Sequence, residues 1–455
     1  MITSTAFAGK HFAVLGLARS GLATVQALAG SGAQVTAWDD RAEARRQAEL
    51  VDGVTCVDFG AADLAEFDSL VVSPGVPLNR SPLVERARAA GVEIIGDIEL
   101  FARARGELPP HKVIGITGTN GKSTTTALVH HILTEAGVPS LMAGNIGLPI
   151  LGVDPLPRGG IYVLELSSYQ IDLTQSLDCD VAVLLNITPD HLDRYADFEA
   201  YARSKLRLFG MQAPGRPVLI GDPTGPEDDL IGDFLDELHA EGRNPVEHQV
   251  LMDTAWDRGT SFSNGALWID GRRVAPQADW PALQGPHNAW NASIAAPACQ
   301  LIGLDLGAIV EGLQTYAGLP HRMERIAEKN GVLFVNDSKA TNADAAAPAL
   351  GAYPRLRWIV GGRAKADTLG ATAHYLEHVA KAYTIGEAGP LFAQLLRDAS
   401  VEVVECGTLD EAVKAAAAEA QAGETVLLSP ACASFDQFRD FEARGDAFRA
   451  AVEAL

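Results

Sequence analysis

The chain is poor in cysteine, and the cysteines it has are scattered. No pair of the five forms a C-x-x-C motif. Neither a zinc cluster nor a disulfide framework is therefore indicated, and a reducing cytoplasm is the expected location. The five residues are Cys56, Cys179, Cys299, Cys406 and Cys432.

The chain also has fewer basic than acidic residues. Lys and Arg number 36 against 58 Asp and Glu, which gives a formal net charge of -22. Phosphate backbones attract clustered cations, so this balance argues against a nucleic acid or an anionic membrane as partner. An anionic substrate must then be held by local features such as glycine-rich turns, helix N-termini and metal ions.

Long apolar runs are absent as well. No run reaches the length needed to span a membrane, and residues 1–10 lack a basic segment followed by an apolar one. We therefore expect no membrane insertion and no targeting segment.

The composition does suit a globular protein of several domains. The 455 residues are 47% hydrophobic and 21% charged, and short β-branched runs alternate with alanine-rich amphipathic stretches. This alternation is typical of β-α-β units around parallel sheets. We expect three α/β domains, at 1–104, 105–318 and 319–455, with a polar linker at 106–110. Expected strands are 11–16, 34–38, 112–117, 332–335, 358–360, 382–385 and 425–428, with irregular or short antiparallel strands in 250–273.

The strongest local signal is a glycine-rich segment, GITGTNGKST at 115–124, between an apolar strand and a helix expected over 123–135. In such a loop, backbone N–H groups converge on phosphate oxygens, Lys122 reaches the terminal phosphates and Ser123 can ligate Mg²⁺. Ile116 occupies the first glycine position of the strict Walker pattern. A purely structural glycine turn is the alternative.

Two further strands of this block end in polar residues. Glu165 follows one apolar run, and Asn186, Asp190 and His191 follow another. Ligands of open α/β sheets gather at the carboxyl ends of the strands, so Glu165 and His191 are candidate magnesium ligands. Taken singly, a carboxylate or a histidine at a strand end is more often a cap or turn residue, and the neighbouring phosphate loop is what favours a metal site here.

The first block contains a degenerate dinucleotide-binding turn. Gly16 and Gly21 follow the first strand, and Asp39 and Asp40 end the next, but Ala18 replaces the second glycine of the pattern. An NAD-dependent dehydrogenase is therefore one alternative function.

Eight segments resemble the Mur ligase family, in family order and across nearly the whole chain. NITPDHLDRY and the last two resemble its D-glutamate-adding branch most closely. The segments are TGTNGKS at 117–123, GNIG at 144–147, ELSSYQ at 165–170, NITPDHLDRY at 186–195, GPHNAWN at 285–291, GLPHRME at 318–324, NDSKATN at 336–342 and SPACASFDQF at 429–438.

The resemblance implies a fold and a reaction. The domains would be a Rossmann-like N-terminal domain that binds UDP-substrate, a central P-loop ATPase-like domain with a mainly parallel sheet, and a C-terminal Rossmann-like domain that binds glutamate. The reaction would join D-glutamate to UDP-N-acetylmuramoyl-L-alanine at the expense of ATP, through an acyl phosphate. We expect a monomer that closes its second and third domains around the nucleotide.

The resemblance also implies site residues. Lys122, His191, Lys205 and Lys339 would be catalytic. Two Mg²⁺ ions would be held by Ser123, Glu165, His191 and Lys205, with a CO₂-derived carbamate on Lys205. ATP would contact Gly118, Thr119, Asn120, Gly121, Lys122, Ser123, Thr124, Asn288, Asn291, Arg322 and Asp337. UDP-substrate would contact Asp40, Arg41, Ser73, Gly75 and Asn145. Glutamate would contact Thr341, Lys365, Ser434, Phe435 and Phe441.

Two segments of the expected glutamate site have features of their own, and the sequence also allows alternative functions. The segment at Ser434 and Phe435 follows a strand, so its N–H groups are expected to open a helix. Arg363 and Ala364 precede Lys365, where the family often has an acidic residue. The alternatives are another amino-acid-adding ligase of the superfamily, such as a diaminopimelate- or lysine-adding enzyme or a folylpolyglutamate synthase, and a non-catalytic nucleotide sensor.

Overall fold

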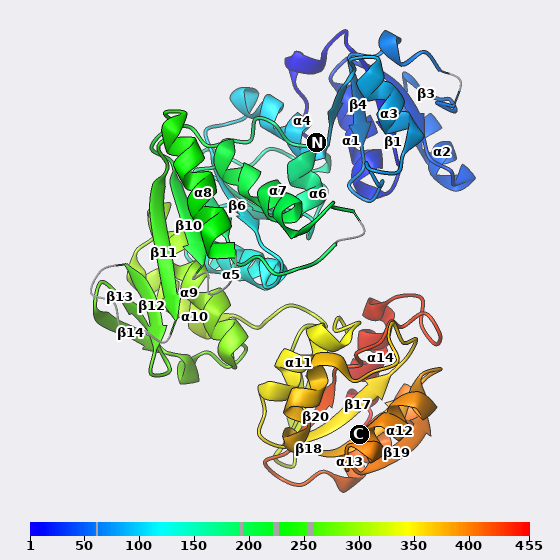
Figure 1. Ribbon diagram of the computed structural model, residues 1–455, viewed down its shortest axis with the longest axis vertical. Coiled ribbons are helices and arrows are strands. Elements are labelled where there is room, and N and C mark those ends of the chain that lie inside the picture. Colours follow the sequence, from blue (N-terminus) through cyan, green and yellow to red (C-terminus); the bar gives the residue numbers. More distant parts are fainter. Residues whose placement is uncertain (61, 192–193, 222–226, 253–258) are drawn as a thin grey trace. The chain divides into compact units, whose positions relative to one another are not determined.

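The computed structural model describes residues 1–60, 62–191, 194–221, 227–252 and 259–455. The chain packs as two compact units. Met1–Ala275 and Asn291–Gly312 make up the first, and Pro276–Trp290 and Leu313–Leu455 the second. The described part contains three sheets, and the strands of each lie within one of the three blocks expected from the sequence (Figure 1). The domain boundaries at 104/105 and 318/319 stay predictions.

The first sheet is parallel, in the order β3-β2-β1-β4-β5. Its strand order reverses between β1 and β4, which is where open α/β sheets form a ligand crevice. The expected strands at 11–16 and 34–38 are confirmed. The bounds are β1 His11–Leu15, β2 Gln34–Trp38, β3 Val54–Cys56, β4 Ser69–Val72 and β5 Glu93–Ile95, with helices α1 Arg19–Gly30, α2 Ala42–Glu49, α3 Pro82–Ala89 and α4 Asp97–Ala104.

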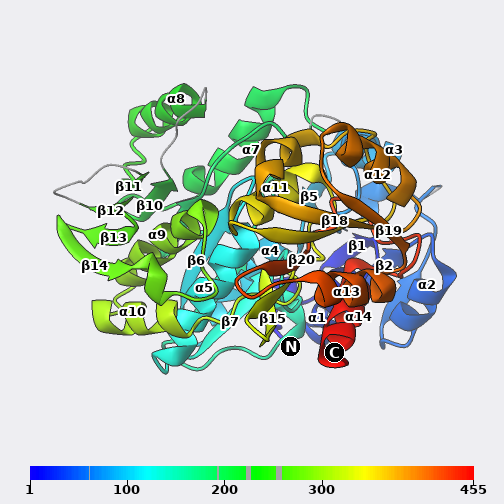
Figure 2. The same ribbon diagram turned by 90° about the horizontal axis from the view of Figure 1, so that it is seen from below.

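The central sheet has the order β14-β13-β12-β11-β10-β9-β6-β8-β7. Its core is parallel because β6 pairs with both β8 and β9 in that sense. Figure 2 shows β11 to β14 together, away from β6. The strands are β6 Lys112–Thr117, β7 Ser140–Gly144, β8 Ile161–Glu165, β9 Val181–Leu184, β10 Pro217–Gly221, β11 Val246–Met252, β12 Thr260–Ser263, β13 Ala266–Ile269 and β14 Arg272–Pro276.

Helices complete the central part of the chain: α5 Lys122–Glu135, α6 Ser168–Asp172, α7 Phe198–Gly210, α8 Glu227–Ala240, α9 Pro286–Leu301 and α10 Leu306–Thr315. The expected short antiparallel strands within 250–273 are confirmed by the β12–β13 pair. Residues 253–258 of that range lie outside the described residues. Among the described residues, no helix is both long enough and apolar enough to cross a membrane.

The third sheet has the order β15-β16-β20-β17-β18-β19, and β15 is antiparallel to β16. All four expected strands are present, and β20 has the predicted bounds. The strands are β15 Glu324–Lys329, β16 Val332–Asn336, β17 Leu356–Gly361, β18 Val379–Ile385, β19 Val403–Gly407 and β20 Thr425–Leu428. The helices are α11 Ala343–Gly351, α12 Gly389–Asp398, α13 Leu409–Glu419 and α14 Phe441–Glu453.

One expected helix start is wrong. Ser434 and Phe435 do not open a helix, because α14 begins only at Phe441, where the Asp440 carboxylate caps the backbone N–H of Ala443. The intervening residues are held by tertiary hydrogen bonds instead. Arg363 and Ala433, for example, exchange two backbone hydrogen bonds of 2.8 and 3.0 Å.

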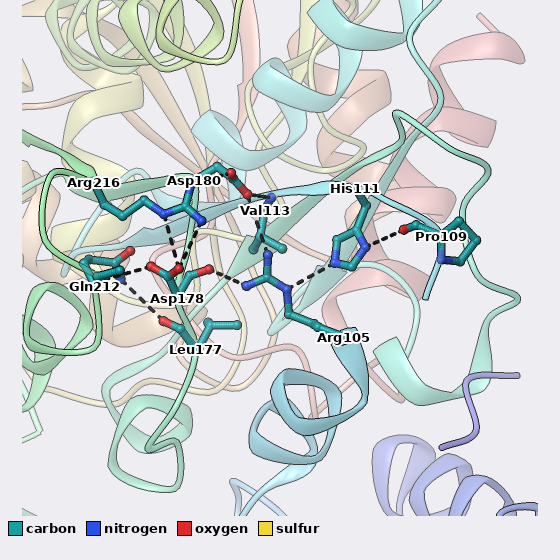
Figure 3. A network of polar contacts seen from close by, with 10 residues as sticks. Arg105, Pro109, His111, Val113, Leu177, Asp178, Asp180, Gln212 and Arg216 are labelled. Carbon is teal, nitrogen blue, oxygen red and sulfur yellow. Dashed lines mark hydrogen bonds and ion pairs between the residues drawn. The ribbon is translucent and has the colours of Figure 1, made fainter. Parts of the chain in front are cut away.

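Each sheet carries charged side chains at the amino ends of its strands. In the central sheet, Asp178 and Asp180 precede β9 and bind Arg216, with distances of 3.0 and 2.8 Å (Figure 3). Arg105 joins them and donates to His111 Nε2 at 3.1 Å. The expected linker at 106–110 is thus bordered by fixed residues at both ends.

The other two sheets have the same arrangement. Arg103 binds Glu93, the first residue of β5, and the Ser69 hydroxyl, at the start of β4, donates to the same carboxylate at 3.0 Å. In the third sheet Arg357 donates to Glu424, just before β20, at 2.8 Å. The loops that follow the carboxyl ends of the strands carry the candidate site residues described below.

Candidate active site

The glycine-rich segment forms the connection between β6 and α5. Its helix starts at Lys122, one residue before the expected start, and ends at Glu135 as predicted. Gly121 has φ = +83°, and a Cβ there would lie 2.3 Å from the Asn291 side-chain oxygen. Glycine is therefore required at this position, both for the backbone conformation and for the approach of α9.

Two lysines converge on one backbone oxygen of this loop. Lys122 Nζ donates to the Gly118 carbonyl at 2.9 Å, and Lys205 Nζ, from α7, donates to the same oxygen at the same distance. Lys122 also donates to the Thr119 carbonyl at 2.8 Å. The sequence placed these lysines 83 residues apart, and the fold brings them together beside the glycine loop.

Lys205 is 2% exposed. Burial lowers its pKa well below the usual 10.5, and the nearby charge of Lys122 lowers it further. A buried amine of lowered pKa is a nucleophile near neutral pH, unlike an ordinary surface lysine. The Tyr201 ring lies 4.6 Å from its nitrogen.

Glu165 ends β8, as predicted, and is 1% exposed. One of its carboxylate oxygens accepts from the Asn145 side chain at 2.8 Å. The other is buried with no hydrogen-bond partner among the described residues. An unpartnered buried carboxylate oxygen is costly unless it meets a cation, so this atom suits a metal ligand.

Residues that the sequence did not assign to the site hold the glycine loop in place. The Asn186 side chain exchanges hydrogen bonds with the backbone of Asn120, at 2.9 and 3.1 Å. The hydroxyl groups of Tyr201 and Thr119 are 3.1 Å apart, and Thr119 also accepts from the Thr188 N–H. Tyr201 stands four residues before Lys205 in α7, a spacing that places both on one helix face.

His191 lies on the exposed side of this region. It has φ = +54°, its ring packs 5.0 Å from that of Tyr169, and its Nε2 is 3.5 Å from the Asp190 carboxylate. Across the described ranges, no three His, Cys, Asp or Glu side chains gather closely enough to hold a metal ion. Metal ligation by His191 therefore stays a prediction.

The two asparagines expected beside adenine are both buried in α9. They are three residues apart, so they share a face of that helix. Asn291 accepts from the Thr125 hydroxyl at 3.3 Å, directly behind the glycine loop, and the Asn288 amide donates to the Gln284 carbonyl at 3.1 Å.

Asp337 and Lys339 lie just beyond β16 in the second unit. Asp337 is buried, and its carboxylate accepts from the Ser429 hydroxyl at 2.7 Å and from the Met323 N–H at 3.2 Å. Burial raises its pKa to about 7. The Lys339 nitrogen lies 3.8 Å from the centre of the Phe441 ring. Arg322 precedes Met323, and its charge acts on Asp337.

The residues expected to bind glutamate lie on three loops of this unit and at the start of α14. Lys365 Nζ donates to the Thr341 hydroxyl at 3.5 Å. Ser434 is buried, whereas Phe435 is 68% exposed. Phe441 begins α14.

In the first sheet, Ser73 and the turn after β1 face each other across the crevice. The Ser73 hydroxyl donates to the Gly16 carbonyl at 2.9 Å. Asp39, which the resemblance did not single out, joins the turn after β1 to the residues after β2. Its carboxylate accepts from the Leu17 N–H at 2.7 Å and pairs with Arg41 at 3.0 Å. The Arg41 guanidinium lowers the pKa of Asp39 to about 2. Asp40 and Gly75 are exposed.

Three family models match successive parts of the chain. The Mur ligase MurD-like N-terminal domain matches residues 10–96, the Mur ligase middle domain 116–299, and the Mur ligase glutamate ligase domain 321–432. The glycine loop and Glu165 fall within the second match.

Curated relatives match the full length. A UDP-N-acetylmuramoylalanine--D-glutamate ligase of Novosphingobium aromaticivorans is 55% identical, over 100% of this chain and 97% of its own. One of Sphingopyxis alaskensis is 56% identical over 100% of both. One of Caulobacter vibrioides is 47% identical over 100% of this chain and 98% of its own.

Solved structures share the fold at low identity. A UDP-N-acetylmuramate-alanine ligase of Thermotoga maritima has a TM-score of 0.58 at 17% identity, over 98% of this chain and 99% of that one. The MurF ligase of the same organism, solved with ADP, has a TM-score of 0.56 at 16% identity, over 100% and 97%. The family models and full-length relatives establish that this chain belongs to the Mur ligase family.

Proposed function

We propose that the protein joins D-glutamate to UDP-N-acetylmuramoyl-L-alanine, with ATP converted to ADP and phosphate, as a cytoplasmic step of peptidoglycan precursor synthesis. The names of relatives at 45–56% identity over the whole chain support this substrate pair. The terminal phosphoryl of ATP would pass to the alanine carboxylate. The glutamate amine would then attack the acyl carbon, forming the C–N bond and releasing phosphate.

The observation that carries the phosphoryl-transfer step is the convergence of Lys122 and Lys205 on the Gly118 carbonyl. A phosphate beside the loop would meet the Lys122 ammonium and the N–H groups that open α5. Such preorganised charge is what phosphoryl transfer requires, because the protein mainly positions and stabilises the transferring group.

The residues present fit a magnesium site. The unpartnered oxygen of Glu165 and the Ser123 hydroxyl are the oxygen ligands that Mg²⁺ prefers, and phosphate oxygens would complete the shell. Bound Mg²⁺ would neutralise charge on the transferring phosphoryl. Asn145, by holding the other Glu165 oxygen, orients the carboxylate. The second site, with His191 and a carbamate on Lys205, is part of this proposal.

The carbamate follows from the chemistry of Lys205. Its lowered pKa leaves a neutral amine that can attack CO₂, forming an N–C bond with loss of a proton. The product is an anion with two oxygens, which suits a hard cation and places a negative charge beside the Lys122 ammonium.

The remaining assignments follow the resemblance. Asn288, Asn291, Arg322 and Asp337 would contact ATP, and Lys339 would lie near the reacting phosphate. Thr341, Lys365, Ser434, Phe435 and Phe441 would hold glutamate. Asp40, Arg41, Ser73, Gly75 and Asn145 would contact the UDP-substrate.

The first sheet gives little support to the dehydrogenase alternative. Both oxygens of Asp39 are already bonded, to the Leu17 N–H and to Arg41, so this carboxylate is not free to accept a ribose hydroxyl. The crevice at Ser73 lies at the reversal of strand order and suits a single nucleotide such as UDP.

The test is ADP release by the purified protein with ATP, Mg²⁺ and UDP-N-acetylmuramoyl-L-alanine, in separate reactions with D-glutamate, L-glutamate, lysine and diaminopimelate. We expect ADP release in the reaction with D-glutamate and not in the reactions with the other three amino acids. Release with another amino acid alone would overturn the substrate assignment and leave the ligase assignment standing. ATP binding without release in any reaction would favour a nucleotide sensor.

A further inference from the structure

Arg444, in the first turn of α14, is buried, and among the residues that the structure describes it makes no hydrogen bond to a carboxylate. Its side chain is among the largest that are fully buried, at 1% exposed. Nε donates to the Ser338 hydroxyl at 2.9 Å, one Nη to the Ser338 carbonyl at 2.8 Å, and the other Nη to the Cys432 carbonyl at 3.0 Å. All three acceptors are uncharged oxygens on loops at the carboxyl ends of strands.

These contacts join two loops that are distant in sequence. Ser338 stands between Asp337 and Lys339, and Cys432 is two residues before Ser434. A third loop is close by: a Cβ at Gly362 would lie 3.1 Å from Arg444 and 2.4 Å from the Ala433 carbonyl. Gly362 begins the loop that carries Lys365. The guanidinium therefore lies where all three loops meet.

Both sides are also held by other hydrogen bonds. The Ser338 loop has backbone bonds from Asp337 to Leu428, from Lys339 to His321 and from Ala340 to Asp337. The Cys432 loop is paired with the Lys365 loop through Arg363 and Ala433, and Gly361 donates to the Pro430 carbonyl. Arg444 bonds both sides at once, so its loss should let the paired Cys432 and Lys365 loops shift relative to the Ser338 loop.

The charge of Arg444 also matters. Burial lowers its pKa to about 10, so the group still carries a proton at neutral pH. Asp436 and Asp337 act on it only as neighbouring charges, and its bonds go to neutral oxygens. In a chain of net charge -22, a fixed buried cation makes the entry of a dicarboxylate less unfavourable.

We propose that Arg444 is a positioning residue that holds the Cys432 and Lys365 loops against the Ser338 loop and so sets the site for the amino acid that is added. This rests on the proposed function. Arg444 acts through the loops and does not itself contact the substrate. Lysine cannot replace it, because one ammonium cannot span Ser338 and Cys432 as the planar fork does.

The experiment compares Arg444→Lys with the unaltered chain in two reactions. One uses D-glutamate as the amine, and the other uses hydroxylamine, which attacks an acyl phosphate to give a hydroxamate and phosphate without occupying an amino-acid site. We expect Arg444→Lys to raise the KM for D-glutamate about tenfold or more while hydroxylamine-supported ADP release stays within about threefold. Ser338→Ala, which removes one acceptor, should raise the same KM by a smaller factor.

Arg357→Lys is the matched control. Arg357 is also a buried arginine of this sheet, but it bonds Glu424 at the amino ends of the strands. The Arg357→Lys substitution should lower the unfolding temperature and leave the KM for D-glutamate unchanged.

The proposal is overturned if Arg444→Lys leaves the KM for D-glutamate unchanged, or if both reactions fall together. If Arg444→Lys does not fold, an unchanged KM in Ser338→Ala overturns it. Hydroxylamine turnover without D-glutamate turnover in the unaltered chain would instead refute the proposed substrate, and the Arg444 assignment with it.

Discussion

At the scale of single residues, Lys205 shows the cost of building a reactive group into the interior. A buried amine resists protonation, so the folded state binds fewer protons than the unfolded chain between its lowered pKa and 10.5. This penalty is present at neutral pH and disappears as pH rises towards 10.5.

In buffer free of CO₂, Lys205→Met should therefore be more stable than the unaltered chain at pH 7, and it should lack ligase turnover because the nitrogen that would carry the carbamate is lost. Urea unfolding and ADP release measure the two effects. Lys414→Met is the control, since Lys414 is exposed and pairs with Asp410 one turn away in the same helix. Equal stability of the Lys205 variant and the unaltered chain would contradict the buried, uncharged amine.

The effect of Asp337 on stability has the opposite dependence on pH. Its pKa is raised from 3.8 to about 7 by burial, so the folded state keeps a proton that the unfolded chain releases. The contribution of this carboxyl group to the free energy of unfolding is fully present below pH 3.8 and is lost as pH rises through 7. Asp337→Asn should then be more stable than the unaltered chain by about 2 kcal/mol at pH 8, and by less at pH 5.

Urea unfolding at pH 5 and pH 8 tests this prediction. Asp410→Asn, on the exposed start of α13, should change the free energy of unfolding little at either pH. A gain in Asp337→Asn that is the same at both pH values would show that the carboxylate is not protonated in the folded protein.

At the scale of elements, the glycine loop depends on α7. Tyr201→Phe removes the hydroxyl 3.1 Å from Thr119 and keeps the ring beside Lys205. One neutral hydrogen bond contributes about 1 kcal/mol, so the KM for ATP should rise about threefold to tenfold with a smaller change in kcat. Tyr162→Phe, which loses a bond to the Leu156 N–H at the start of β8, should leave the KM for ATP unchanged.

The charged cluster at the amino end of β9 is a second element with its own prediction. Arg105→Met leaves the Asp180 carboxylate short of one cation, the Asp178 carbonyl without a donor and His111 Nε2 without its donor. We expect a loss of about 3 kcal/mol in stability and no change in the KM for ATP, since the glycine loop lies at the other end of the strands. Urea unfolding and ADP release check both parts. Arg46→Met, on an exposed pair, should cost far less.

Elements differed in how far the sequence could predict them. The strand Thr425–Leu428 and the helix ending at Glu135 were predicted because apolar runs and a glycine turn are local signals. The start of α14 was missed because residues 431–440 are fixed by partners elsewhere in the chain, such as Arg363 and Arg444, which no local pattern shows.

The site divides in the same way. Lys122 and Glu165 could be placed from the residues alone, since a glycine loop and a strand end are visible in sequence. Lys205 needed the family resemblance, because nothing local distinguishes a buried lysine from a surface one. Arg444 and Tyr201 were not assigned, and Asp39 was noted only at the end of a strand, since their roles come from contacts that only folding creates.

At the scale of the whole molecule, the chain forms two compact units, and large multidomain proteins do not unfold in one step. Calorimetry should resolve two transitions. Arg105→Met should lower only the one belonging to Met1–Ala275, and Arg357→Met only the one belonging to Leu313–Leu455. A single transition that both variants lower equally would contradict independent units.

In all three sheets a cluster of ion pairs sits at the amino ends of the strands, and the glycine loop, Glu165, Ser73, Lys339 and Arg444 sit at or beyond the carboxyl ends. These clusters at the amino ends are therefore places where substitutions can change the stability of the fold without touching the groups at the carboxyl ends.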